Sequence, residues 1–246
     1  MIVIPMAGLS ARFTAAGYDK PKYMLDLHGA PVFDHSIASF RAYFATVPFL
    51  IICRGDAETE GFVRARTAAL GVKGTTIITL GEPTRGQADT VAQGLFCAGV
   101  DPNTDITIFN IDTFRPGYRR PAVADAPDIE GCLEVFVGEG LNWSFVRPRS
   151  DESTLVAETS EKRPISDLCC TGLYQFRHAG ALLDALAHAR FDPTLQGPGG
   201  ESYVAPLYNH LIRQGARIGY SVVSRSEVTF CGVPAEYEAL RQNKCA

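Results

Sequence analysis

Short apolar runs rich in β-branched residues alternate, along the first half of the chain, with segments whose apolar residues recur at helical spacing. Four runs have the length and composition of buried strands: residues 1–5, 48–53, 75–80 and 105–111. Helical spacing predicts three helices between or after them: the segment carrying Phe33, Ile37, Phe40 and Phe44, then 57–70 and 86–98. This alternation is typical of βαβ units and predicts a mainly parallel sheet with helices on its faces.

The alternation loosens in the second half, where strands follow one another with short connections. Strands are expected over residues 132–137, 143–146, 155–157, 172–176 and 217–223. Helices are expected over residues 177–189, 203–214 and 234–242. No linker, internal repeat or low-complexity segment divides the 246 residues, a length that suits one large α/β domain. We therefore expect a single domain.

The overall composition argues against several classes of function. Because the formal net charge is -4, no broad basic surface is expected for nucleic acid or an anionic membrane. No apolar run approaches the length of a membrane span, and the first five residues are too short for a signal-peptide core, so we expect a cytoplasmic protein. The seven cysteines include no C-x-x-C pair, which argues against a disulfide framework and a structural zinc.

The loop after the first predicted strand carries the first candidate chemistry. Gly8 allows a tight turn in which successive backbone N–H groups can face an anion. Arg12 adds a planar set of donors suited to phosphate oxygens, and Lys20 and Lys22 bring two more cations toward the same place. Taken alone, the stretch fits a tight turn with solvated charges equally well, because short glycine motifs occur often.

Two further features fall on the same edge of the predicted sheet, since ligands of open parallel sheets bind outside the carboxyl ends of the strands. Gly86 and Gln87 open a predicted helix and offer backbone and amide groups, although an ordinary first helical turn explains them as well. Asp112 follows the fourth strand. A carboxylate there suits a hard cation, but a lone Asp after a strand is more often a turn or cap residue.

The combination resembles a known family. Residues 5–13, Lys20-Pro21-Lys22, Leu25 and Gly29-Ala30-Pro31 resemble, in order and spacing, the N-terminal signature of the sugar-phosphate nucleotidyltransferases, the nucleotide-sugar pyrophosphorylases. The resemblance implies an α/β fold: the Rossmann-like, three-layer, GT-A-like fold of that family, with a mainly parallel mixed sheet. It also implies that residues 1–115 form the nucleotide-binding half of the domain and residues 116–246 the acceptor-binding half.

The resemblance also implies roles for the first half. Ala7, Gly8 and Ser10 would lie against the nucleotide phosphates, and Gly86 and Gln87 would contact the nucleoside. Arg12 would hold the phosphates that leave as pyrophosphate, Lys22 would neutralise the reacting α-phosphate, and Asp112 would bind Mg2+. The reaction suits these residues, because an anionic acceptor phosphate needs no general base and the protein supplies positioning and positive charge.

For the acceptor half the likeness is weaker. Glu161 and Lys162, expected in a loop between strands, resemble the family element that contacts the sugar phosphate, although such a pair is usually a solvated surface pair. Gly172 stands in a strand like the one that lets a sugar approach the backbone, and Glu201 resembles an acceptor-pocket residue, although a helix start explains it equally well. One departure concerns the metal: Phe230 stands where many members carry a second carboxylate. Either one protein carboxylate holds Mg2+ with phosphates and water, which we favour, or activity is weakened.

The leading hypothesis is transfer of a nucleotidyl group from a nucleoside triphosphate to a sugar phosphate or related phosphorylated acceptor, with release of pyrophosphate. The short length, Asn110-Ile111-Asp112-Thr113 and Glu201-Ser202-Tyr203 together resemble a branch associated with capsule and surface-polysaccharide synthesis. That resemblance implies a pyrimidine nucleotide such as CTP, UTP or dTTP. Two alternatives stay open: a GT-A-type glycosyltransferase that consumes a nucleotide-sugar, and a nucleotide-sugar sensor without turnover, which Phe230 favours. The sequence leaves open the acceptor, the nucleobase and whether the chain forms a homo-oligomer.

Overall fold

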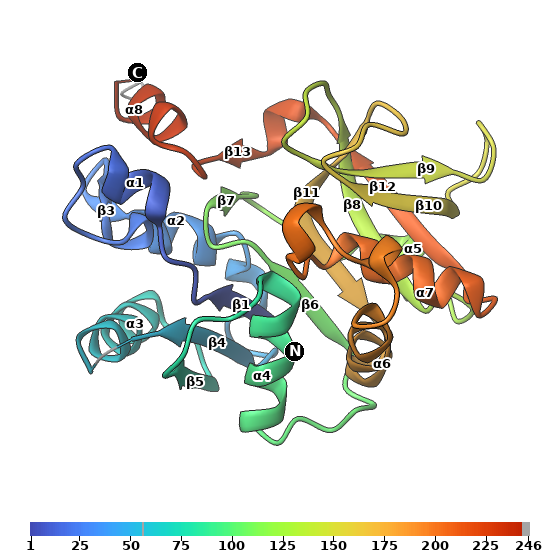
Figure 1. The fold of residues 1–246 in the computed structure, drawn as a ribbon. Helices are drawn as coiled ribbons and strands as arrows, with labels where there is room; N and C mark the ends of the chain where they lie inside the picture. Colours follow the sequence, from blue (N-terminus) through green and yellow to red (C-terminus); the bar gives the residue numbers. More distant parts are fainter. Residues whose placement is uncertain (56, 243–246) are drawn as a thin grey trace.

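A nine-stranded mixed sheet runs through the computed structural model, which describes residues 1–55 and 57–242. Seven strands lie side by side: β10 (Val156–Glu161), β9 (Ser144–Pro148), β11 (Leu168–Phe176), β6 (Ile106–Phe109), β1 (Ile2–Met6), β4 (Phe49–Arg54) and β5 (Thr75–Leu80). The other two strands, β8 (Gly131–Val137) and β12 (Ile218–Val223), continue the sheet from β11. Strands from both halves of the chain therefore belong to one sheet (Figure 1).

The sheet has a parallel part and an antiparallel part. Strands β5, β4, β1 and β6 pair in parallel, whereas β11 runs antiparallel to β6, β8 and β9. Because β1 lies between β4 and β6, the carboxyl ends of three neighbouring parallel strands meet at one edge. The loops that follow β1 and β6 therefore open onto the same side of the molecule.

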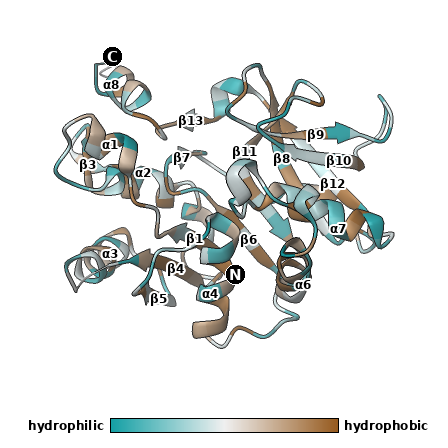
Figure 2. Cartoon of the chain, viewed as in Figure 1, coloured by the Kyte–Doolittle hydropathy of each residue, from teal (hydrophilic) through white to brown (hydrophobic). Residues whose placement is uncertain are grey.

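Helices cover both faces of the parallel part. Side chains alternate between the faces of a strand, and in β4 Leu50 and Ile52 join one apolar cluster while Phe49 and Ile51 join another. The first cluster includes residues of α4 (Gln87–Cys97), α6 (Ala179–Ala189) and α7 (Tyr208–Arg213), and the second includes residues of α2 (Val32–Ala38) and α3 (Ala57–Leu70). The strands are accordingly apolar on both faces (brown along β1, β4 and β6 in Figure 2). The expected three-layer, Rossmann-like α/β fold is confirmed.

Two expected helices are shorter than their spacing suggested. The helix carrying Phe33 ends at Ala38 and continues only as a 3-10 turn over Arg41–Tyr43, although Phe40 and Phe44 stay buried. The helix expected over 203–214 is a 3-10 turn over Ala205–Leu207 followed by α7. Pro206 lies in that turn and has no N–H to donate to an α-helical ladder.

The segment carrying Glu161 is a strand, so the expectation of a loop there was wrong. Strand β10 runs from Val156 to Glu161, and Lys162 follows directly. It is an edge strand with a polar composition, and such strands lack the apolar signature of buried ones. At Thr159 the free edge is covered by a side chain: the Asn209 amide accepts from the backbone N–H and donates to the backbone C=O, both at 2.8 Å.

Several short elements complete the fold and were not expected from the sequence. The first loop contains α1 (Ala11–Ala15), a 3-10 turn over Lys22–Met24 and the pair β2 (Asp26–Leu27) and β3 (Ala30–Pro31). Further along are β7 (Thr113–Phe114), α5 (Ala122–Asp125), 3-10 turns over Pro193–Leu195, Pro198–Gly200 and Arg225–Glu227, and β13 (Thr229–Phe230). The last helix, α8 (Pro234–Gln242), lies where the sequence predicts it. No helix within the described ranges is long and apolar enough to span a membrane.

Candidate active site

A cleft of about 1190 Å³ opens at the carboxyl ends of β1 and β6. All twelve residues to which the resemblance gives a site role line it: Ala7, Gly8, Ser10, Arg12, Lys22, Gly86, Gln87, Asp112, Glu161, Lys162, Gly172 and Glu201. They come from elements spread over nearly 200 positions of the chain, and the sheet brings them to one side. Their individual roles stay predictions. Lys20, the other cation expected near the first loop, does not line the cleft.

The glycine loop is fixed at its two ends. Phe13, in α1, is 1 % exposed and packs with Tyr237 of α8 in a small apolar cluster. The Ser10 hydroxyl accepts the backbone N–H of Lys22 at 3.3 Å, which joins the two ends of the signature. The Ser10 backbone adopts a left-handed conformation, with φ of 51°, a sign of a locally constrained turn.

The interior of this loop is open toward the cleft. No heavy atom lies within 4 Å of the position that a side chain at Gly8 would occupy. Arg12 is exposed, and its guanidinium group forms no ion pair or hydrogen bond with any residue that the structure describes. An open backbone turn beside an unpaired guanidinium group offers both space and charge to an anion.

Lys22 and Asp112 form an ion pair across the floor of the cleft. The Lys22 ammonium nitrogen lies 2.5 Å from Asp112 Oδ2, and both side chains are about one-fifth exposed. The loop signature and the end of strand β6 therefore meet directly, as the sheet topology predicts. A ligand that binds either partner must compete with the other for it.

A second carboxylate, that of Glu236 in α8, lies near Asp112. A side-chain carbon added at Gly232 would lie 3.1 Å from Asp112 Oδ2 and 3.7 Å from Glu236 Oε2. Glu236 Oε2 accepts the backbone N–H of Gly232 at 2.8 Å. Burial, reinforced by the charges of Asp112 and Glu236, raises the pKa of the neighbouring Cys231 thiol to about 12. Asp112 and Glu236 thus bring two carboxylates to one place, the type of ligand that a hard divalent cation prefers. In the structure Asp112 Oδ2 is paired with Lys22, and Glu236 Oε2 accepts the N–H groups of Gly232 and Val233.

The ring of Phe230 forms an apolar wall at the position where the resemblance leads us to expect a carboxylate. The pairing of β13 with β7 places it opposite Thr113, the residue after Asp112. Its ring centroid lies 4.6 Å from that of Trp143 and 5.4 Å from that of Phe136. The Arg225 guanidinium carbon lies 4.9 Å from the centre of the same ring. Phe230 therefore belongs to an aromatic cluster at the edge of the cleft.

The two glycines beyond the first loop have their side-chain space filled by protein. A side chain at Gly86 would lie 2.6 Å from Ser202 O, and one at Gly172 would lie 2.3 Å from the Asn110 amide nitrogen. Asn110 also accepts a hydrogen bond from Gln87 Nε2 at 2.5 Å. Hence Gly86 and Gly172 are required by packing, and the amide of Gln87 is held in a defined direction by Asn110.

The acceptor side of the cleft is a network of side chains. Glu161 accepts a short hydrogen bond from the Ser144 hydroxyl, which lies 3.3 Å from Tyr174 Oη. Burial raises the pKa of Glu161 above its usual range, against the lowering effects of Ser144 and the Lys162 charge. Next to it, Lys162 Nζ donates to the Tyr203 hydroxyl. The sequence placed Tyr203 in a stretch that resembles the acceptor pocket and Asn110 in the element that carries Asp112, but it predicted none of the contacts of Tyr203, Asn110 or Glu236 across the cleft, because they join residues far apart in the chain.

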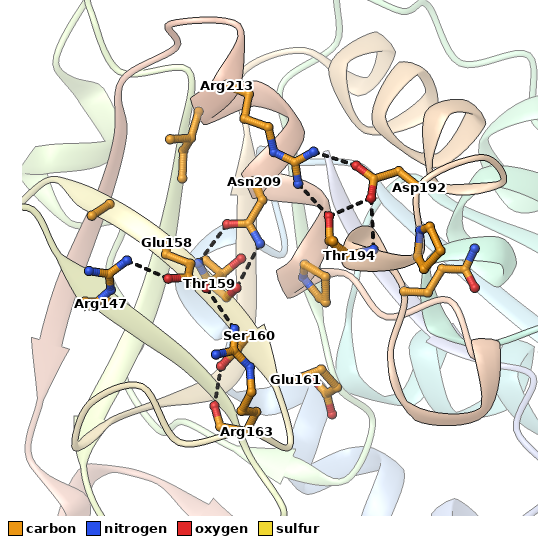
Figure 3. A pocket seen from close by; sticks show the side chains of 15 residues that line it. Arg147, Glu158, Thr159, Ser160, Glu161, Arg163, Asp192, Thr194, Asn209 and Arg213 are labelled. Carbon is orange, nitrogen blue, oxygen red and sulfur yellow. Dashed lines mark hydrogen bonds and ion pairs between the residues drawn. The ribbon is translucent and has the colours of Figure 1, made fainter.

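A second cavity of about 750 Å³ lies on the other side of β10 (Figure 3). Its three arginines are paired within the cavity: Arg147 and Arg163 both bind Glu158, at 2.5 and 2.8 Å, and Arg213 binds Asp192. Glu161 borders both spaces. Because its donors are already occupied, this cavity is a weaker anion site than the cleft.

One three-residue group within the described part of the chain has ligand atoms close enough for a metal: Asp184, His188 and His210, within 4.8 Å of one another. It lies on α6 and α7, and none of its members lines the cleft. The two imidazole rings stack at 4.3 Å with 28° between their planes, so their in-plane lone pairs run nearly side by side instead of converging. We read the group as an Asp184 carboxylate shared by two histidines.

No protein-family model matches the chain, and no curated protein matches it in sequence. Among solved structures it is similar to the nucleoside-diphosphate-sugar pyrophosphorylase from Vibrio cholerae RC9, at 49 % identity and a TM-score of 0.93, over 99 % of this chain and 100 % of that one. It shares the fold of the inositol-1-phosphate CTP transferase from T. maritima (14 % identity, TM-score 0.71, 97 % and 93 % covered). It also shares the fold of the UTP-bound UGPase from Acinetobacter baumannii (14 %, 0.68, 98 % and 91 %).

Proposed function

Because the chain belongs to the family of nucleoside-diphosphate-sugar pyrophosphorylases, which are sugar-phosphate nucleotidyltransferases, we propose that it transfers a nucleoside monophosphate from a pyrimidine nucleoside triphosphate to a sugar phosphate or a similar phosphorylated acceptor. Pyrophosphate is the second product. The observation that carries the proposal is the cleft itself, where an open glycine loop beside the unpaired Arg12 shares one space with Lys22, Asp112 and, on the other wall, Lys162.

In the proposed reaction, an oxygen of the acceptor phosphate attacks the α-phosphorus of the nucleotide. A new P–O bond forms there as the bond from the α-phosphorus to the bridging oxygen breaks, and pyrophosphate leaves with the electron pair. The residues of the chain act by charge and position. Arg12 neutralises the leaving phosphates, Lys22 the α-phosphate, and Lys162 holds the acceptor phosphate so that repulsion between the anions is offset.

The backbone of the glycine loop orients the triphosphate. Ala7, Gly8 and Ser10 present the turn, and the open space beside Gly8 lets phosphate oxygens approach the backbone. Gly86 and Gln87 line the nucleoside end, where the amide of Gln87 is directed by Asn110. Gly172, Glu201 and Glu161 complete the acceptor end.

We propose that the site binds Mg2+ through Asp112, assisted by Glu236 in place of the carboxylate that Phe230 replaces. The two carboxylates on either side of Gly232 fit a hard cation that keeps part of its water shell. When bound, such an ion would neutralise phosphate charge. Asp112 would then exchange its contact with Lys22 for the ion, and Lys22 would be free to reach the α-phosphate.

The pyrimidine assignment has support from two proteins that share the fold: one is named for CTP and the other was solved with UTP bound. The further proposal of a role in capsule or surface-polysaccharide synthesis rests on the sequence resemblance to that branch. A sensor that binds a nucleotide-sugar without turnover is the second candidate, favoured by Phe230 and its aromatic contacts. A glycosyltransferase is less favoured, because the family of pyrophosphorylases forms nucleotide-sugars.

The test is a pyrophosphate-release assay. Purified full-length protein with Mg2+ is mixed with CTP, UTP, dTTP, ATP or GTP and with a panel of sugar 1-phosphates and other small phosphomonoesters. Release that needs both substrates, is largest with a pyrimidine nucleotide and is lost in Arg12→Ala supports the proposal. Arg64→Ala is the matched control, since Arg64 lies on α3 in a surface pair with Glu60. Nucleotide-sugar binding without release across the panel supports the sensor instead.

A further inference from the structure

The segment from Gly197 to Tyr203, here called the strap, borders the cleft. It contacts both the nucleoside end and the acceptor end. Its backbone is fastened to the loop before α4: the Ser202 N–H donates to Arg85 O at 2.8 Å, and the Ala88 N–H donates to Ser202 O at 2.9 Å. These bonds lie on either side of Gly86, whose missing side chain leaves the space that the Ser202 backbone occupies. The strap is therefore attached by its backbone to the nucleoside-binding loop.

The last residue of the strap holds the acceptor lysine. Lys162 Nζ donates a hydrogen bond to the Tyr203 hydroxyl and lies 4.5 Å from the centre of the Tyr203 ring. The hydroxyl in turn donates to Glu201 Oε2 at 2.5 Å. Tyr203 thus contacts the ammonium group and also links it to a carboxylate of the strap. A hydrogen bond to a charged group is among the stronger ones in proteins.

Both partners of this contact are fixed in place. Lys162 has φ of 55°, a left-handed conformation that is uncommon for a residue with a side chain, and its N–H donates to Trp143 O at 2.8 Å. The Tyr203 ring lies against Gly197, where an added side-chain carbon would be 2.2 Å from Cδ2 of the ring. The contact with Gly197 therefore holds the Tyr203 ring in the position in which its hydroxyl meets the Lys162 ammonium group.

We infer that Tyr203 is a positioning residue that sets the Lys162 ammonium group for the acceptor phosphate, and that the strap couples this setting to the nucleoside-binding loop at Gly86. The inference rests on the proposed function for the identity of the ligands, but the contact itself is independent of turnover. Tyr203 acts through Lys162 and through the backbone bonds of Ser202. A nucleotide that orders the loop at Gly86 would thereby also order the Lys162 ammonium group, which receives the acceptor phosphate.

The first test measures the reactivity of Lys162 and needs no acceptor. The full-length protein is treated with a limiting amount of an acetylating reagent, and the labelling of each lysine is followed by mass spectrometry, with the exposed Lys73 as internal reference. Tyr203→Phe removes the hydroxyl and keeps the ring, so Lys162 labelling is expected to rise on the order of threefold relative to Lys73. Unchanged Lys162 labelling would overturn the positioning role.

The coupling is tested by Gly86→Ala, which has no contact with Lys162 but forces the Ser202 backbone to move. Lys162 labelling is expected to rise in this variant as well, and Gly197→Ala, which displaces the ring directly, should give the same result. Tyr220→Phe is the matched control, because its hydroxyl bonds to Ser153 O away from the cleft. If Gly86→Ala leaves Lys162 at its wild-type reactivity while Gly197→Ala does not, the coupling through the strap is wrong.

The second test uses steady-state kinetics with the sugar 1-phosphate and nucleotide that give turnover in the pyrophosphate assay. Tyr203→Phe is expected to raise the acceptor KM about tenfold, as for loss of one hydrogen bond to a charged group, and to leave the nucleotide KM within about twofold. A rise confined to the nucleotide KM would overturn the inference. Absence of turnover by the wild type would contradict the proposed function, whereas the labelling result would still decide the role of Tyr203.

Discussion

The two ends of the cleft are built in different ways. At the phosphate end, one continuous segment supplies a backbone turn, an open space at Gly8 and the unpaired guanidinium group of Arg12, and Lys22 is paired with Asp112. At the acceptor end, side chains from β9, β10, β11 and the strap bind one another: Ser144 with Glu161, and Lys162 with Tyr203. The first end is arranged around a space for a ligand, and the second satisfies its own polar groups.

Because of this difference, we expect substitutions at the two ends to change activity and stability in different ways. A group that touches nothing in the protein is free to act only on a ligand, so its removal changes activity with little effect on stability. A group bound to several others affects both, because its partners are left without hydrogen bonds in a partly buried place.

Arg12→Ala should give the largest effect on activity. Loss of one charged donor to a transition state costs about 10²–10³ in kcat, and the unfolding free energy should change little, since Arg12 is exposed and unpaired within the described residues. Pyrophosphate release and urea denaturation measure the two quantities. A large loss of stability in this variant would mean that the phosphate end is not organised around a ligand.

Asp112→Asn should come next. It removes a charge from the site proposed for Mg2+ and leaves Lys22 without its partner, so activity should fall by about 100-fold, the scale of perturbed metal sites. The measurement is a Mg2+ titration of pyrophosphate release, in which the half-saturating concentration should move upward. Asp26→Asn, at an exposed turn on the first loop, serves as control. An unchanged Mg2+ dependence would contradict the metal role.

Phe230→Asp tests the acceptor end, by restoring the carboxylate that the family resemblance leads one to expect. The contacts of the ring with Trp143 and Phe136 are lost, so we expect a loss of about 2–3 kcal/mol in the free energy of unfolding, below the range for fully buried aromatic residues because this ring is partly exposed. Phe230→Leu, which keeps an apolar side chain, should lose less. Equal stability of the two variants and the wild type would show that the aromatic cluster contributes nothing.

Glu161→Gln should have the smallest effect, and its sign depends on pH. Because burial raises the pKa of Glu161 in the folded protein, its contribution is most favourable when it is protonated, below its unfolded pKa, and is lost as pH rises through the folded pKa. The neutral glutamine should therefore raise the melting temperature slightly at pH 7 and leave it nearly unchanged near pH 4. Thermal melts at both values check this, and destabilisation at pH 7 would assign the carboxylate a net stabilising contact with Ser144 or Lys162.

Much of the fold could be predicted because its central strands are buried on both faces. Strands β1 and β4 read as apolar runs, and the helix after β4 follows at the expected place. Strand β10 could not be read in the same way. Most of its residues are polar, since it lies at the edge of the sheet, and its extension to Glu161 depends on pairing with β9, a property of the folded chain.

In the candidate site, too, some residues could be predicted from the sequence and others could not. The phosphate end was readable because its residues are adjacent in the sequence and their spacing is the signal. Tyr203 was not, because its contact with Lys162 joins positions 41 residues apart. The role of Gly86 was only partly readable: its position at a helix start is local, but the need for glycine comes from Ser202, which is more than 100 positions away.

The Asn209 amide of α7 takes the place of a neighbouring strand at the edge of β10. By accepting from the N–H and donating to the C=O of Thr159, it occupies two groups that a strand from another molecule would need for edge-to-edge pairing. The edge at Thr159 is buried beneath α7, and the Thr159 hydroxyl also donates to Ala205 O at 2.6 Å. Replacing Asn209 with a residue that lacks an amide would leave the backbone N–H and C=O of Thr159 buried without partners, which is costly in free energy.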